Sequence, residues 1–183
     1  MAALFWQFLF YGFLGFLFEV AYARATLSAR RERKCHLLLP VCPVYGVGGV
    51  LLGLLPGRLA AHPLLLFFLA AGVCTAAEWS MSLFYEKATG TAFWNYSGLP
   101  GSLRGRVCPL FSLFWGLLSL PLVYWVQPRL AALTAAASPA FSAPFVLFYA
   151  ADALVSLALL RRGGREALSW RRFRAAAAPE ESR

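Results

Sequence analysis

Three carboxylates lie inside or at the edge of strongly apolar stretches of this 183-residue chain. They are Glu19, Glu78 and Asp152, and no lysine or arginine lies within the apolar stretches to neutralise them. A charged side chain at the centre of a bilayer costs roughly 2.5–3.5 kcal/mol on the scale derived from membrane insertion. Each acid is therefore expected to be protonated, to reach water in a cavity, or to pair with an arginine near the cytoplasmic surface.

The depth of each acid separates two interpretations. Glu19 lies five residues before Arg24, about 7.5 Å along a helix, which fits a position at the membrane interface. Glu78 and Asp152 lie deeper in their apolar stretches. They are either structural acids with internal hydrogen bonds, or sites on a path for a solute or protons.

The segment between the third and fourth apolar runs combines aromatic side chains with arginines. Its aromatic residues either form an interfacial belt or, together with the arginines, line a cytoplasmic vestibule. The residues predicted to line a solute or ion path are Glu19, Glu78, Asp152, Arg104, Arg106, Asn95, Trp94 and Tyr96.

A Val-Cys-Pro sequence occurs twice, at the start of the second run and at the start of the fourth. Proline suits the first turn of a helix, where its missing N–H is no loss. A cysteine before that turn lies beside free backbone amides, which favour a thiolate and attract anions. The simpler interpretation is that the prolines only begin helices. The predicted helix-start residues are Cys42, Pro43, Tyr45, Gly46, Cys108 and Pro109.

Five apolar runs must position these residues. Each is long enough for a hydrocarbon core of about 30 Å, which takes about 20 helical residues. The chain is 60% hydrophobic and 14% charged, against about 45–50% and about 25% in soluble proteins. We predict an all-α integral membrane protein, with a transmembrane domain over residues 1–162 and a basic tail over residues 163–183. The predicted spans are Leu4–Tyr22, Leu37–Leu55, Pro63–Phe84, Val107–Val126 and Ser142–Leu160.

Basic residues predict the orientation of the spans. The second and fourth gaps hold one arginine each, Arg58 and Arg129, whereas the first gap, the third gap and the tail are rich in lysine and arginine. The positive-inside rule then places the amino terminus outside and the carboxyl terminus in the cytoplasm. The basic residues of the rich segments are Arg24, Arg30, Arg31, Arg33, Lys34, Lys87, Arg104, Arg106, Arg161, Arg162, Arg165, Arg171, Arg172 and Arg174.

Small residues recur at helical spacing along the runs, among them Gly15, Gly49 and Gly116. In lipid, small residues let helix backbones approach closely, so these positions are predicted to be packing seams. Each Val-Cys-Pro start also follows a run that carries a carboxylate in its inner half, Glu19 or Glu78. This indicates a parallel two-hairpin repeat followed by a fifth helix, an arrangement known among transporters.

Several function classes are disfavoured. The net charge of +9 comes from residues in the gaps, where they set orientation, so nucleic-acid binding is not expected. The four cysteines lie within a span or on the predicted cytoplasmic side, so a disulfide framework is not expected. No metal-ligand spacing, cofactor site or catalytic constellation is visible, and an enzyme is not expected.

Several motifs together resemble the bacterial putative ABC transporter permease family, type IV. They are the FGFLFEV-like stretch of residues 11–20, CPVYGVGG from Cys42, and the pattern EW…FYEK…FWNYS…GRVC. The resemblance covers residues 8–124, and the family usually has an acid where this chain has Asn95. The matching residues are Glu19, Cys42, Pro43, Tyr45, Gly46, Glu78, Trp94, Tyr96, Gly105, Arg106 and Cys108.

The resemblance implies a multi-pass protein of the bacterial cytoplasmic membrane with a role in transport. The chain has no phosphate-binding loop, so ATP hydrolysis would come from a separate ATPase partner. Five spans are few for a permeation path, which favours a homo-oligomer or another membrane partner. The basic tail is expected to contact anionic lipids. The alternative is a non-transporting scaffold or accessory protein, whose buried ion pairs, such as Glu78 with Arg106, set helix register.

Overall fold

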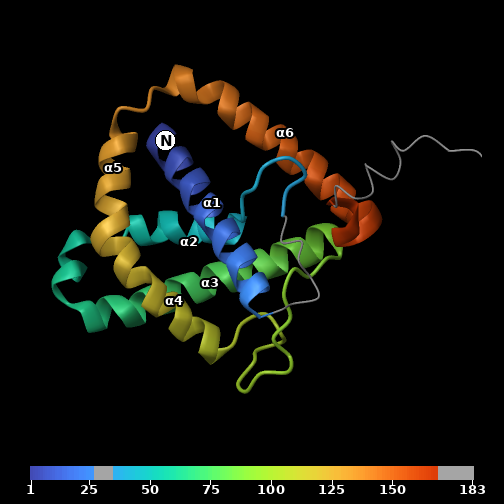
Figure 1. Ribbon diagram of the computed structural model, residues 1–183, viewed down its shortest axis with the longest axis horizontal. Helices are drawn as coiled ribbons and strands as arrows, with labels where there is room; N and C mark the ends of the chain where they lie inside the picture. The colour runs from blue at the N-terminus through green and yellow to red at the C-terminus, as the bar shows by residue number, and fades with distance from the viewer. Residues whose placement is uncertain (27–34, 169–183) are drawn as a thin grey trace, which may run out of the picture.

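The computed structural model describes residues 1–26 and 35–168 and is built from helices (Figure 1). In these ranges the only strand-like feature is an isolated bridge between Leu103 and Val107. The elements are α1 (Ala2–Ala25), α2 (Pro43–Gly53), the 3-10 helix η1 (Gly57–Ala61), α3 (Pro63–Thr89), α4 (Pro109–Pro121), the π-helical turn η2 (Leu122–Val126), α5 (Gln127–Ala135), α6 (Pro139–Gly163) and the 3-10 helix η3 (Gly164–Leu168).

Four helical stretches of the described chain are long and apolar enough to cross a membrane. They cover Ala2–Ala25, Pro63–Thr89, Pro109–Ala135 and Pro139–Leu168. Four of the five predicted spans are therefore confirmed as apolar helices of sufficient length. The third of these stretches joins α4, η2 and α5, so the helix continues beyond the predicted end at Val126. Pro121 and Pro128 lie within it, and prolines are a common cause of the local irregularity that η2 represents.

The predicted helix over Leu37–Leu55 is wrong in its first six residues, 37–42. Residues 35–42 are not helical, and α2 covers only 11 residues. Pro40 and Pro43 explain the late start, because proline removes a backbone donor and disfavours the α conformation of the residue before it. At 1.5 Å per residue, α2 is about 16 Å long, roughly half the thickness of a hydrocarbon core.

Contacts between distant residues define two ends of the molecule. At one end Nε1 of Trp6 donates to Oγ of Ser142 over 2.9 Å, and at the other end Arg165 donates to the carbonyl of Phe93 over 2.8 Å. Helices α1, α3 and α6 run from the first end to the second and α4–α5 run back, whereas residues 35–42 form a loop that turns back on itself, with Sγ of Cys35 3.7 Å from Sγ of Cys42 (Figure 1). Between α1 and α3 the described chain therefore offers only α2, a helix too short to span, in place of the predicted second span.

Glycines allow close contact between neighbouring helices. A Cβ added to Gly49 would overlap the ring of Tyr11, and one added to Gly116 would lie 2.9 Å from the ring of Phe67. These contacts join α2 to α1 and α4 to α3. Small residues on α2 and α4 therefore have the packing role that the sequence predicted.

The folded body extends into the predicted tail. Helix α6 continues to Gly163, and η3 then packs Leu168 in a cluster with Tyr85 and Leu160. Residues 163–168 thus belong to the helical domain. The predicted lipid-binding residues Arg171, Arg172 and Arg174, and the first-gap residues Arg30, Arg31, Arg33 and Lys34, lie outside the described residues.

Candidate functional site

A cavity of about 530 Å³ lies among α1, α2, α3, α4, the loop over residues 90–108 and η3. Its wall is largely aromatic and aliphatic, but two carboxylates and one guanidinium reach it. Among the described residues, the side chains of the wall that carry a polar atom are those of Glu19, Tyr22, Cys35, Tyr45, Glu78, Trp94, Tyr96, Trp115 and Arg165. This volume falls in the range of roughly 300–1,000 Å³ that is usual for small-molecule sites.

Glu78 is the most enclosed acid of the cavity, with 4% of its surface exposed. The hydroxyl of Tyr96 donates to its Oε1 over 2.8 Å, and the indole N–H of Trp115 donates to its Oε2 over 3.2 Å. The two donors come from the loop and from α4, whereas Glu78 lies on α3. Both donors are neutral, so the carboxylate is held by hydrogen bonds rather than by an ion pair within the described ranges.

The second carboxylate is joined to the first by aromatic rings. The hydroxyl of Tyr45 donates to Oε1 of Glu19 over 3.0 Å, and the Tyr45 ring lies 4.8 Å from the ring of Trp115. Trp115 in turn donates to Glu78. Residues of four helices therefore form one continuous polar and aromatic surface on the cavity wall.

The loop that carries Tyr96 is fixed by its own hydrogen bonds. The indole of Trp94 donates to the carbonyl of Arg106 over 2.8 Å, and the backbone N–H of Tyr96 donates to the carbonyl of Gly105 over 2.8 Å. Gly105 has φ of 70°, a left-handed conformation that favours glycine. The ring of Tyr96 stacks on Phe111 at 4.5 Å. Burial, followed by the nearby carboxylate of Glu78, raises the pKa of the Tyr96 phenol, which keeps it a hydrogen-bond donor.

Three residues predicted for the path lie away from the cavity wall. Asn95 accepts hydrogen bonds from the backbone and hydroxyl of Ser97, so it shapes the loop. Arg106 pairs with Glu86 and lies over the ring of Trp79, and it does not form the predicted pair with Glu78. Arg104 is an exposed loop residue with φ of 50°.

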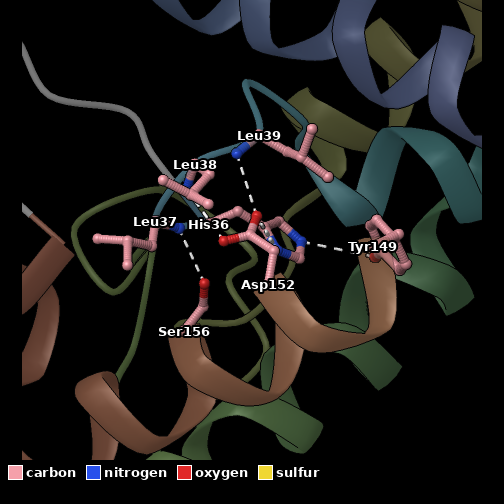
Figure 2. Close-up of polar contacts among 7 residues, drawn as sticks. All are labelled: His36, Leu37, Leu38, Leu39, Tyr149, Asp152 and Ser156. Atoms are coloured by element: carbon pink, nitrogen blue, oxygen red, sulfur yellow. Dashed lines mark hydrogen bonds and ion pairs between the residues drawn. The ribbon is translucent and has the colours of Figure 1, made fainter. Parts of the chain in front are cut away.

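Asp152 lies in a separate cluster (Figure 2). Its two carboxylate oxygens accept hydrogen bonds from the backbone N–H groups of Leu38 and Leu39, each over 3.0 Å. The hydroxyl of Ser156, one turn later on α6, accepts from the N–H of Leu37 over 2.8 Å. In a helix, the backbone N–H groups of residues 37–39 would donate to backbone carbonyls, and here they donate to the side chains of Asp152 and Ser156 instead. Asp152 therefore satisfies non-helical backbone and does not line the cavity.

His36 completes the Asp152 cluster. Its Nδ1 lies 3.5 Å from Oδ2 of Asp152, and its Nε2 lies 3.5 Å from the hydroxyl of Tyr149 (Figure 2). His36 is almost fully buried, with 3% of its surface exposed. The cluster thus joins residues 36–39 to the middle of α6.

The two Cys-Pro sequences begin helices, as predicted. Cys42 and Cys108 are the N-cap residues of α2 and α4, and each is followed by proline at the first helical position. Both thiols are buried, and Sγ of Cys42 lies 3.7 Å from Sγ of Cys35. Burial makes these positions a poor fit to the alternative that the backbone amides of the helix starts favour thiolates and attract anions.

The sequence analysis missed several residues of the cavity. Tyr45 was predicted only as a helix-start residue, and Trp115 and Arg165 were not predicted for the site. A signal for Trp115 was present, because an indole N–H within an apolar helix needs an acceptor. Arg165 was predicted to belong to the basic tail, whereas it lies in η3 and reaches the cavity wall.

Comparison with known proteins supports a family assignment. No curated protein and no solved structure matches the chain. The family described as "Putative ABC-transporter type IV" matches residues 6–158, a range that includes both carboxylates of the cavity and Asp152. The match covers most of the chain, and the chain belongs to this family.

Proposed function

We propose that this protein is the membrane component of an ABC-type transport system, and that the cavity holds the transported solute. The observation that supports the proposal is the gathering of Glu19, Glu78, Trp94 and Tyr96, from three separate parts of the chain, on one cavity wall. These are four of the eight residues predicted for a solute path. Solute sites in transporters commonly lie where helices meet and where polar groups interrupt an apolar wall.

The cavity opens on the apolar surface of two helices. Phe18 and Tyr22 of α1 and Phe114 and Leu117 of α4 line it, and each has half or more of its surface exposed. In a bilayer, this surface would meet lipid. A solute could therefore enter sideways from the membrane as well as from the cytoplasmic end.

Energy would come from a separate ATPase, as the resemblance implies. We propose that the ATPase meets the end that carries residues 90–108 and η3, because the positive-inside rule places this end in the cytoplasm. A second copy of the chain or another membrane subunit would complete the permeation path.

The test uses the complex recovered from native membranes with a tagged chain. The complex is reconstituted into liposomes and incubated with ATP and a mixed extract of cellular metabolites, and mass spectrometry then measures the lumen. We expect ATP-dependent movement of at least one solute, lost in Glu78→Gln and kept in Glu86→Gln. Glu86 is the matched control because it lies on the same helix and outside the cavity wall. Equal movement in the two variants, or recovery of no ATPase, would contradict the proposal.

One observation favours the alternative of a scaffold. Asp152 and the Glu86–Arg106 pair make internal contacts that hold elements together. A scaffold would need these contacts and would not need the cavity. Leu118 of α4 lines the cavity, and Leu118→Trp would fill part of it. This variant therefore separates the two functions, since it should block solute movement but leave partner recovery unchanged.

A further inference from the structure

We propose that the cavity takes an amphipathic monocation, a molecule with one positive charge on a bulky apolar body. This inference rests on the proposed function, because it names the class of solute that the same cavity would hold. It is carried by three features of the wall: a buried carboxylate, the aromatic rings beside it, and the apolar mouth.

The buried carboxylate is that of Glu78. Burying an ionised carboxylate is costly unless it is paired or well hydrogen-bonded. Its two donors, Tyr96 and Trp115, are neutral and leave part of its acceptor capacity open, since a carboxylate has about four lone-pair sites. A cation in the cavity would supply the opposite charge that no lysine, arginine or histidine of the described ranges supplies to Glu78.

Aromatic rings surround this carboxylate on the wall. Tyr45 and Trp115 lie 4.8 Å apart, and Tyr96 donates to Glu78 directly. The faces of such rings attract cations, most strongly when water is excluded. Rings beside a carboxylate suit a weakly hydrated organic cation better than a small metal ion, and the described residues hold no group of three or more histidines, cysteines or acids that would chelate a metal.

The apolar opening of the cavity indicates that the uncharged part of the ligand is apolar. Phe18, Phe114 and Leu117 give it an apolar rim that is half or more exposed. An apolar body would be covered there, while its charge reaches the carboxylates deeper in the cavity. An anion is disfavoured because the most buried charge of the described wall is the carboxylate of Glu78, which has no basic partner among the described residues.

The test compares two probes of nearly the same shape and opposite charge, tetraphenylphosphonium and tetraphenylborate. Equilibrium dialysis measures the binding of each to the full chain in a non-ionic maltoside detergent, which adds no charged headgroup. Protein-free micelles correct for partition into detergent. We expect saturable binding of tetraphenylphosphonium and at least about tenfold weaker binding of tetraphenylborate.

Variants then assign the site. Glu78→Gln should weaken tetraphenylphosphonium binding about tenfold or more, because it removes the buried charge. Glu86→Gln removes one acid from the same helix outside the cavity and should leave binding unchanged. Size-exclusion chromatography and thermal unfolding report whether each variant is folded. If Glu78→Gln does not fold, the comparison of the two probes on the unaltered chain still decides the question.

The outcomes separate this inference from the proposed function. Preference for tetraphenylborate, or no saturable binding of either probe, overturns the amphipathic monocation. ATP-dependent movement of a metabolite that is lost in Glu78→Gln would still support the transport site in that case. Equal tetraphenylphosphonium binding by unaltered chain, Glu78→Gln and Glu86→Gln would overturn the assignment of the cation to this cavity.

Discussion

Glu78 illustrates how an acid can be kept within an apolar helix. Its oxygens are hydrogen-bonded by two aromatic donors that the sequence places 18 and 37 residues away. Charge-assisted hydrogen bonds contribute about 1.5–3 kcal/mol each, more than neutral ones. The same donors also fix the direction of the carboxylate on the cavity wall.

Replacing Tyr96 by phenylalanine should destabilise the protein by about 1.5–3 kcal/mol, because the buried carboxylate loses one of its donors. The measurement is thermal unfolding in detergent, followed by tryptophan fluorescence. Tyr124→Phe is the matched control, since its hydroxyl donates to the backbone carbonyl of Ala60 at a more exposed site. A loss of stability no greater for Tyr96→Phe than for Tyr124→Phe would contradict this role.

Gly105 should tolerate no side chain. Its φ of 70° would strain alanine by about 1–2 kcal/mol, and the added Cβ would lie 2.5 Å from Oδ1 of Asn95. Gly105→Ala should therefore lower the melting temperature, whereas Gly98→Ala in the same loop, where nothing lies within 4 Å, should not. Equal melting temperatures for the two variants would be the contrary result.

Half of the residues predicted for the path reach the cavity wall. Two features of the sequence identified them. Carboxylates within apolar runs are costly and need a partner or a function, as for Glu19 and Glu78. Aromatic side chains beside such runs, as in Trp94 and Tyr96, indicate an interface or a vestibule. The arginines were misplaced for a physical reason. A basic residue in a loop is free to turn to any nearby acid, and Arg106 turns to Glu86 rather than to Glu78.

At the scale of elements, the predicted second span consists of a loop over residues 35–42 and the short helix α2. The helix satisfies its own backbone, whereas residues 37–39 of the loop depend on α6. In a bilayer, irregular backbone is tolerated only where the protein supplies hydrogen-bond partners. Asp152 and Ser156 act as those partners. Asp152, in the middle of α6, therefore has a structural role.

Asp152→Asn should therefore destabilise the protein by about 1–3 kcal/mol, although the substitution is nearly isosteric. An amide offers one oxygen, so its NH₂ group would face one of the two backbone donors, Leu38 or Leu39. The control is Glu86→Gln, also an acid-to-amide change, which weakens an exposed ion pair worth about 0–1 kcal/mol. Thermal unfolding of both variants decides the matter, and a shift for Asp152→Asn no larger than that of the control would refute the role.

The four long helices were predictable, because hydrophobic length alone identifies them. The second span was mispredicted for two reasons. Hydropathy treats Pro40 and Pro43 as apolar residues and ignores their effect on the backbone. The partners of its non-helical residues 37–39 also lie 113 to 119 residues later in the chain, beyond any local pattern.

At the scale of the whole molecule, α3 joins residues 57–61 to residues 90–108 and is long and apolar enough to span, so these two segments are predicted to lie on opposite sides of the membrane. Fusion of alkaline phosphatase after Gly57 should give an active, external enzyme, and fusion of green fluorescent protein after Gly98 should give cytoplasmic fluorescence. These outcomes follow from an amino terminus outside and a carboxyl terminus inside. Inactive phosphatase at Gly57 would mean that residues 35–55 return to the side from which they start.

The central claim is that a solute binds against Glu78 in the cavity between α1 and α4. The most direct measurement is an experimental structure of the assembled complex, recovered with its ATPase and trapped with its transported solute. We expect ligand density next to the Glu78 carboxylate, against the rings of Tyr45 and Trp115. Solute density that lies elsewhere, with this cavity filled only by detergent or lipid, would contradict this claim.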